Sequence, residues 1–512
     1  MLIVYHMIHY NHKRFLLMKV QTLPISSRLS ALMAITFLSS FAYYGFRATL
    51  FYYLVQTLGI TLTKGADIFI AFIALHFVTQ AVCGWLSDNH YGNKMGLLIG
   101  SVMIFLGGAL SLTSYSIAYY LGFSLLVLGT SFMHVNLVAT LGRIMDHQES
   151  LRLSAFTLFK VVSNSGIFLT ILFFFFTHDQ TMWKNLLIVS SMLSGALIFL
   201  LVLSRCGDCL ALDGVKTFAE DENASNQEGI GKIYSLLLLL PLSSVTAFLI
   251  WKSEWLGMMV PIVCIVGFFL ALHGALIRKM LLSMTFLFAL FILNVCYITL
   301  FHYASSAWVG YLTINFQNHI QSLNGLFSQN YASVLHLPDV AMRILNSMMV
   351  LILGPFFAVF WFVFFKRKHP LSPFLKTAIG FVLSALSFGI LTLSKNYYSA
   401  DGGIDLTWFV CAHLLYAAGE LMILPVALSY LTSVAPKDSL ALYAGGWLMA
   451  GAIPIYLNKY ITNFFGLDLL SQSAEISSST YTDIFGVLSW SSFGLGLISF
   501  MVFLATRKIF EK

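Results

Sequence analysis

Long apolar runs recur along nearly the whole chain, and short polar connections separate them. Each run holds about 20 apolar residues, which is the length that an α-helix needs to cross a bilayer. None shows the alternation expected of a barrel strand, so we predict an all-α membrane protein with fourteen spanning helices. The predicted spans lie near residues 30–58, 67–87, 95–114, 117–141, 153–177, 183–204, 234–251, 255–277, 280–311, 341–365, 373–394, 407–434, 441–465 and 483–506.

Composition agrees with this pattern and narrows the possible chemistry. Of the 512 residues, 59% are hydrophobic and only 10% are charged, which excludes a soluble domain of this length. The six cysteines are scattered, so no disulfide framework is predicted. Cys206 and Cys209 form a single Cys-Gly-Asp-Cys, interpreted as a polar helix end because no second ligand pair accompanies it. We expect no cofactor, no metal and no enzymatic activity.

Basic residues are distributed unevenly between the two sides of the predicted membrane. If the N-terminus is cytoplasmic, twenty of the twenty-eight Lys and Arg residues fall on cytoplasmic connections or tails, and six fall outside. This bias predicts that both termini face the cytoplasm, and the membrane is expected to be a bacterial inner membrane. The net charge of +7 is therefore not interpreted as a nucleic-acid footprint.

One acidic polar stretch, residues 205–232, divides the chain and is predicted to be a cytoplasmic linker. Residues 1–29 would form an N-terminal tail, and residues 30–204 an N-terminal half of six helices. Two inserted helices would occupy residues 233–277. Residues 278–512 would form a second six-helix half with a short cytoplasmic tail.

The two halves share short stretches of related sequence. GTSFMHVNLVATL (129–141) resembles GELMILPVALSYL (419–431), and ESLRLSAFTLF (149–159) resembles DSLALYAGGWL (438–448). The offsets are nearly equal, at 290 and 289 residues. Such a parallel repeat is typical of the major facilitator architecture, which binds substrate at the midplane between its halves.

Three charged residues lie deep inside apolar runs, namely Arg47, Lys160 and Glu420. A charge at the bilayer centre costs about 2.5–3.5 kcal/mol even on lenient scales, so each must face a partner, water or a ligand. A structural ion pair is the alternative for Arg47 and for Glu420. For Lys160 the alternative is a side chain that reaches the cytoplasmic interface.

Polar residues accompany these charges at helical spacing. Arg47 continues a stripe on the first span that also contains Thr36, Ser39, Ser40, Tyr43 and Tyr44. A guanidinium at this depth suits bidentate capture of a carboxylate or phosphate. Asn164 lies one turn after Lys160, and Pro425 follows Glu420 as a predicted kink. His134 and His302 could titrate near neutral pH, or could be ordinary buried histidines.

Motifs along nearly the whole chain resemble those of the proton-dependent oligopeptide transporter family. YYGFRATLFYYL resembles the family's first-span signature, GWLSDNHYGNK (84–94) its loop between spans two and three, and SFMHVNLVATLG its fourth span. SAFTLFKVVSNSG, RILNSMMVLILGPFFAVFW and GELMILP are similar to its fifth, eighth and tenth spans. This resemblance implies a major facilitator fold with two extra helices and transport by alternating access.

The resemblance also implies roles for individual residues. Tyr43, Tyr44 and Arg47 match positions that hold a peptide's carboxylate, and Asn164, Asn346 and Glu420 match those that hold its α-amino group. Other positions depart from the family: its charged first-span triplet falls on Thr36, Ser39 and Ser40, its fourth-span Lys is His134, its seventh-span Glu is His302, and Lys160 replaces a Tyr.

We therefore predict a secondary transporter for di- and tripeptides or similar zwitterions. The predicted binding residues are Tyr43, Tyr44, Arg47, Lys160, Asn164, Asn346 and Glu420, and the candidates for proton coupling are His134, His302 and Glu420. One alternative is a divergent carrier of a non-peptide anion or zwitterion that works without protons. A second is a membrane-embedded acyltransferase using His134 or His302, although an enzyme has no need of a duplicated half.

Overall fold

The computed structural model describes residues 25–113, 115–146, 148–176, 188–203, 237–257, 259–260, 262–263, 281–315, 338–365, 371–397, 405–457 and 478–510. Every structural statement below concerns this part of the chain. Cys206, Cys209 and the predicted linker 205–232 lie outside it. The division of the chain at that linker therefore stays a prediction.

The described residues are almost entirely helical. The N-terminal group of helices, as we call it, is α3 (Ile25–Tyr52), α4 (Leu62–Leu86), α5 (Gly92–Ser111), α6 (Ser116–Ile144), α7 (Glu149–Phe176) and α9 (Ser194–Leu203). The C-terminal group is α14 (Leu281–Asn315), α17 (Pro338–Phe365), α18 (Pro373–Leu393), α19 (Leu406–Val434), α20 (Leu440–Leu448) and α22 (Ser478–Phe510). Between them in sequence lies α12 (Leu239–Trp251).

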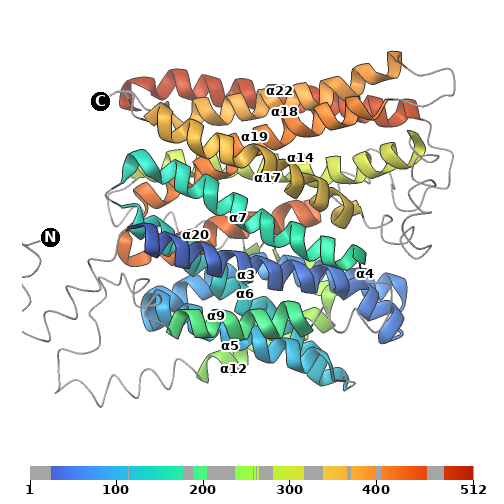
Figure 1. Ribbon diagram of the computed structural model, residues 1–512, viewed down its shortest axis with the longest axis vertical. Coiled ribbons are helices and arrows are strands. Elements are labelled where there is room, and N and C mark those ends of the chain that lie inside the picture. Colours follow the sequence, from blue (N-terminus) through green and yellow to red (C-terminus); the bar gives the residue numbers. More distant parts are fainter. Residues whose placement is uncertain are drawn as a thin grey trace, which may run out of the picture.

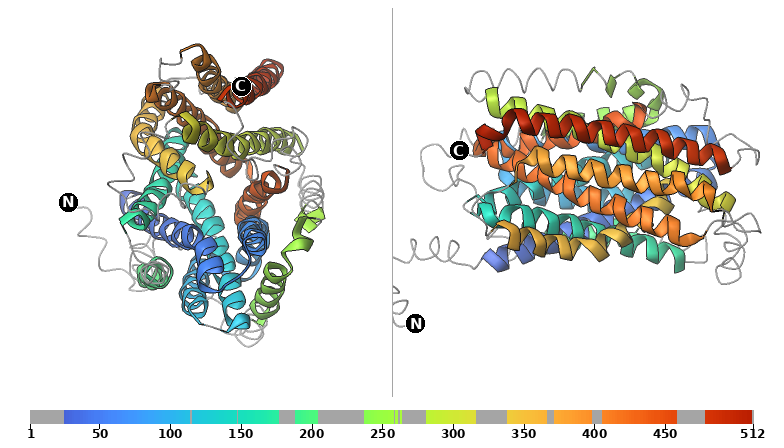
Figure 2. Two further views of the ribbon diagram at one scale, coloured as in Figure 1. Left: turned by 90° about the vertical axis from the view of Figure 1, so that its right-hand side faces the viewer. Right: turned by 90° about the horizontal axis from the view of Figure 1, so that it is seen from above.

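The helices run roughly parallel to one another, and apart from α7 and α20 the C-terminal group lies above the N-terminal group in Figure 1. Two helices join the groups: α20 packs against α4 and α6, and α7 packs against α17 and α19. The same crossing is visible from the end of the bundle in Figure 2. α3 begins and α22 ends at the same end of the molecule (Figure 1).

The helix bounds reproduce the internal repeat. α6 (Ser116–Ile144) and α19 (Leu406–Val434) are both 29 residues long, and their starts and ends are separated by the same 290 residues. Each helix is followed by a second one, α7 or α20, that crosses to the opposite group. The predicted major facilitator arrangement, with spans four and five corresponding in both halves, is therefore confirmed.

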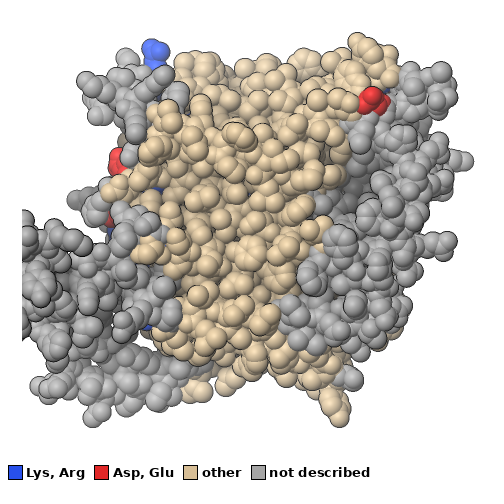
Figure 3. Space-filling model, viewed as in Figure 1, with Lys and Arg blue, Asp and Glu red and all other residues tan. Residues whose placement is uncertain are grey.

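The side surface of the bundle is apolar, as a bilayer requires. Exposed large hydrophobic side chains are found on helices of both groups, including Phe105 on α5 and Phe356 on α17. In Figure 3, the charged side chains of the described residues stand near the two ends, and the middle of the visible face is uncharged. Ten described segments are long and apolar enough to cross a membrane, and the segment Leu62–Ser111 contains two helices. The prediction of fourteen spans stays a prediction.

Local chemistry explains where two of these helices begin. Gly92 starts α5 with φ at 71°, a left-handed conformation that a side chain would oppose. Asp405 caps α19 by accepting a hydrogen bond from the Thr407 backbone N–H at 2.7 Å. Its hydrogen bonds with the hydroxyl and N–H of Thr407 hold the pKa of Asp405 below its usual value.

The first inserted helix, α12, packs against the N-terminal group. The Ser124 hydroxyl on α6 donates a hydrogen bond to the Ser243 carbonyl at 2.6 Å. Just after α12, Glu254 lies 3.5 Å from Lys64 of α4, and the Ser253 hydroxyl accepts a hydrogen bond from Lys64 at 3.3 Å. Most of the second predicted inserted span, 255–277, lies outside the described residues.

Candidate functional site

An ion pair joins the two helix groups in the middle of the bundle. Lys160 Nζ on α7 lies 2.7 Å from Glu420 Oε1 on α19, and the carboxylate side chain is only 6% exposed. The other carboxylate oxygen, Oε2, accepts a hydrogen bond from Asn346 Nδ2 on α17 at 2.7 Å. Glu420 of α19 is thus held by side chains from two other helices, one from each group. The structural ion pair named as the alternative for Glu420 is present in the structure, with Lys160 as the partner.

Asn164 belongs to the same group of contacts. Its Nδ2 donates to the Lys160 carbonyl at 2.8 Å, and its Oδ1 accepts from the Ser347 hydroxyl at 3.2 Å. α7 and α17 can approach here because Gly354 lies directly opposite Val161, where a Cβ would come within 2.1 Å of a methyl carbon. Lys160, Asn164, Asn346 and Glu420, named together from sequence, are therefore brought together by the fold.

Tyr43, Tyr44 and Arg47 form a second cluster within the N-terminal group. Arg47 is 3% exposed, and its guanidinium carbon lies 5.9 Å from the ring centres of both Tyr44 and Phe69. Tyr43 stacks on His76 of α4 with ring centres 4.0 Å apart. The convergence of this cluster and the Glu420 group on one binding cavity stays a prediction.

His76 is a buried histidine that the sequence analysis did not single out. It hydrogen-bonds through Nδ1 with the Thr130 hydroxyl at 3.1 Å and through Nε2 with Gln80 Nε2 at 3.0 Å. Its ring is nearly parallel to that of His134, with centres 6.2 Å apart. The spacing of His76, Thr79 and Gln80 on one helical face was the signal that could have found it.

The two histidines named from sequence have different surroundings. His134 lies beside His76 and within electrostatic reach of Lys160. His302 is half-buried on α14, and its ring lies 5.9 Å from that of Phe301. The first is therefore connected to the central ion pair, whereas a role of His302 in coupling stays a prediction.

A polar network closes one end of the bundle, which we call the network end. The Asp88 carboxylate, between α4 and α5, accepts the Leu442 backbone N–H in the first turn of α20 at 2.7 Å. Arg143 lies 3.5 Å from the same carboxylate and donates to the Lys437 carbonyl at 3.0 Å. Lys437 also pairs with Asp146 of the N-terminal group. These contacts hold the two helix groups together at this end.

Replacing Asp88 by Asn is expected to weaken this closure. A carboxylate at a partly buried helix N-terminus contributes up to about 2 kcal/mol, so the ratio of closed to open molecules at this end should fall about 5- to 30-fold. Distances between spin labels on Asn89→Cys and Ser433→Cys, both exposed in the structure, would report the change. An unaltered distance distribution would contradict this role of Asp88.

Comparison with known proteins relates this geometry to a family. A model described as "POT family" (PTR2) matches residues 275–473, which contain Asn346, Glu420 and the whole of α19. "Uncharacterized transporter YclF" of Bacillus subtilis is 27% identical over 447 residues, covering 84% of this chain and 86% of the relative. The chain therefore resembles the POT family, whose model matches residues 275–473. It is a multi-pass membrane transporter and not an enzyme, so the acyltransferase alternative is wrong.

Other relatives and solved structures match this chain over a similar share of its length. "Dipeptide and tripeptide permease A" of Salmonella typhimurium is 23% identical over 453 residues, covering 87% of this chain and 85% of the permease. A structure described as a bacterial homologue of the human drug peptide transporters PepT1 and PepT2 shares the fold, with a TM-score of 0.64, 19% identity, and coverage of 95% of this chain and 100% of the other. A POT family transporter in complex with a thioalcohol conjugated peptide has a TM-score of 0.62 at 20% identity, covering 94% and 96%.

Two first-span residues that depart from the POT pattern, Thr36 and Ser40, form neutral hydrogen bonds in the structure. The Thr36 hydroxyl donates to the Leu32 carbonyl of its own helix at 2.8 Å. The Ser40 and Ser163 hydroxyls form a 2.8 Å hydrogen bond between α3 and α7. Neutral contacts therefore occupy these first-span positions, on which the charged triplet of the family pattern falls.

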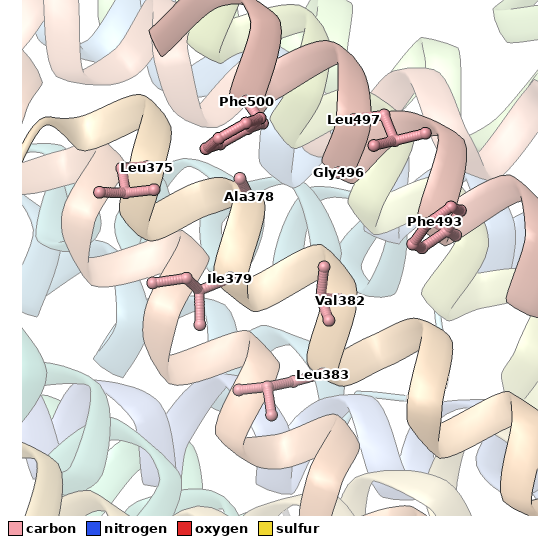
Figure 4. Close-up of a pocket in the computed structure, with 9 residues that line it drawn as sticks. All are labelled: Leu375, Ala378, Ile379, Val382, Leu383, Phe493, Gly496, Leu497 and Phe500. Carbon is pink, nitrogen blue, oxygen red and sulfur yellow. The ribbon is translucent and has the colours of Figure 1, made fainter. Parts of the chain in front are cut away.

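An apolar groove of about 290 Å³ lies between α18 and α22, away from the central ion pair. Figure 4 shows the side chains of Leu375, Ile379 and Phe500 among those that line it. All its lining residues are apolar, and none of the predicted binding residues is among them. It therefore belongs to the lipid-facing side and not to the transport site.

Proposed function

We propose that this protein moves di- and tripeptides, or zwitterions of similar size, across the membrane by alternating access. The observation that carries the proposal is the Lys160–Glu420–Asn346 group between the two helix groups. A zwitterion suits this group because its ammonium can replace Lys160 at Glu420 while its carboxylate pairs with Lys160. Neither buried charge is then left without a partner, which would cost about 3–5 kcal/mol.

The relatives support the peptide part of this proposal. Several relatives between 21% and 25% identical bear the name "Dipeptide and tripeptide permease A", and one solved relative is in complex with a conjugated peptide. The network end would be the cytoplasmic one, as the positive-inside bias predicts. The two groups would then open alternately around Lys160 and Glu420.

Exchange of labelled substrate in proteoliposomes tests the proposal directly. Protein reconstituted with unlabelled dipeptide inside should take up labelled di- or tripeptide from outside without any imposed gradient. Competition by an unlabelled library would define the preferred side chains. Failure of every di- and tripeptide to exchange, with protein that is folded and inserted, would refute the peptide assignment.

A second candidate is transport of a non-peptide zwitterion without proton coupling. The neutral contacts of Thr36 and Ser40 favour it, because the first span contains no acidic side chain that could bind the coupling proton. This candidate is supported by a POT family structure in complex with 5-aminolevulinic acid, 19% identical with a TM-score of 0.61. Exchange of small amino acids in preference to dipeptides would favour this candidate.

If uptake is proton-coupled, we propose that His134 and Glu420 carry the coupling. The groups that face His134 are Lys160 from α7, and His76 and Gln80 from α4. Protonation of His134 would place a second positive charge beside Lys160 and weaken its hold on Glu420. A proton could in this way change the affinity of the central group for substrate.

Replacing His134 by Gln is expected to abolish accumulation driven by a pH gradient while leaving exchange largely intact. A gradient of one pH unit stores 1.36 kcal/mol per proton, enough for about tenfold accumulation. Uptake of labelled substrate with and without the gradient measures both activities. Accumulation that survives in His134→Gln would remove this residue from the mechanism.

A further inference from the structure

His413 is buried two helical turns from Glu420, on the side of α19 that leads away from the network end. It is only 1% exposed. The edge of the Trp308 ring approaches at 4.8 Å between centres, and the Phe409 ring stacks at 5.7 Å. Aromatic side chains from α14 and from its own helix thus enclose the imidazole.

Neither ring nitrogen of His413 has a hydrogen-bond partner among the described residues. Leaving a buried polar atom unsatisfied costs about 1–3 kcal/mol, whereas Phe would fill the same aromatic surroundings without that cost. The Trp308 indole N–H, which lies beside it, also has no partner in the described part of the chain. Packing therefore does not account for an imidazole at this position.

Two tyrosines lie near His413 and the central ion pair. Tyr416 lies between His413 and Glu420 in sequence, and its ring centre is 6.4 Å from that of His413. The Tyr416 ring stacks on Tyr297 of α14 with ring centres 5.6 Å apart, and neither tyrosine hydroxyl has a hydrogen-bond partner among the described residues. Tyr297, Tyr416 and His413 all interact electrostatically with Glu420. The same face of α19 thus presents His413, Tyr416 and Glu420 in order.

We propose that His413 is a proton-binding site that relays protons between Glu420 and the end of the protein opposite the network end. The proposal rests on the transport function proposed above. A proton from water at that end would bind one ring nitrogen to form an imidazolium. The Tyr416 hydroxyl would then accept this proton on its oxygen and release its own to the Glu420 carboxylate. His413 and Tyr416 return to their neutral forms, and Glu420 becomes a neutral carboxyl.

Protonation of Glu420 in this step weakens its ion pair with Lys160. Neutral Glu420 no longer attracts Lys160, so the Lys160 ammonium becomes available to a substrate carboxylate. The titratable groups that face His413 are Tyr416 and Glu420 from α19 and Tyr297 from α14, while α18 contributes Phe388, which packs on Tyr416. Proton arrival at Glu420 is in this way linked to opening of the ion pair.

The test compares two variants of His413 in proteoliposomes. His413→Phe keeps the aromatic packing, and His413→Asn keeps hydrogen-bonding capacity, but neither side chain can carry the proton. Both should exchange labelled dipeptide within about twofold of the wild type and should lose the roughly tenfold accumulation per pH unit. Phe409→Leu, which alters only the packing around His413, should retain accumulation.

Different results would contradict the relay and the proposed function. Accumulation by His413→Phe, or recovery of accumulation in His413→Asn alone, would overturn the relay, because a hydrogen bond or simple packing would then suffice. A wild type that exchanges dipeptide but does not accumulate it would also overturn the relay while leaving the proposed function intact. A wild type that neither exchanges nor accumulates any peptide would contradict the proposed function itself.

Discussion

Glu420→Gln is expected to reduce substrate uptake about a hundredfold or more. The substitution removes the partner of Lys160, and an unpaired buried charge costs about 3–5 kcal/mol, where each 1.4 kcal/mol corresponds to tenfold. It also removes the carboxylate that we propose binds the substrate ammonium. Initial uptake rates and binding of labelled dipeptide to purified protein measure the loss.

The double variant Glu420→Gln/Lys160→Gln separates binding from folding. It leaves no unpaired charge, so its thermal stability should return toward that of the wild type while uptake stays low. If Glu420→Gln instead lowered stability but left affinity unchanged for every accepted substrate, the 2.7 Å pair with Lys160 would be purely structural.

Gly445→Ala is expected to prevent the two helix groups from closing at the network end. A Cβ at Gly445 would lie 2.2 Å from the Gln80 carbonyl oxygen of α4, and α4 places Gly84 equally close to the Ala441 carbonyl of α20. Backbone atoms cannot move aside as a flexible side chain can, and overpacking of this kind costs about 1–3 kcal/mol. Uptake should therefore fall about tenfold or more.

The neighbouring residue supplies a matched control. A Cβ at Gly446 meets nothing within 4 Å, so Gly446→Ala changes the same helix by the same group without the clash. Spin labels on Asn89→Cys and Ser433→Cys should show a longer distance in Gly445→Ala only. Equal effects of the two substitutions would mean that helix propensity, and not the crossing of α4 and α20, limits transport.

Much of the fold could be predicted from the chain because crossing a bilayer is a local requirement. Each span must supply its own run of apolar residues, so the bounds of α6 and α19 were close to the predicted 117–141 and 407–434. The family resemblance extended this to the order of the helices. It also grouped Lys160, Asn164, Asn346 and Glu420, because their matching positions share a role in the family.

Other features could not be predicted because they depend on partners far away in sequence. His76 was missed: its hydrogen bond with Thr130 and its stacking on Tyr43 exist only once α3, α4 and α6 pack together. The Asp88 motif was recognised, but its contact with the first turn of α20 requires residues 354 positions apart to meet. His413 lies two helical turns from Glu420 in the sequence, but the Trp308 ring that helps enclose it comes from α14.

By itself, then, the sequence determined that this is a helical membrane protein with a repeated architecture and three deep charges. Hydrophobic length, charge and repeat are properties that a linear chain carries with it. The tertiary structure alone decided that Lys160 is the cation that meets Glu420, while Arg47 lies against Tyr44 and Phe69. Either cation could have compensated the carboxylate, and the choice follows from the close crossing of α7 with α17 and α19, which places Lys160 within 2.7 Å.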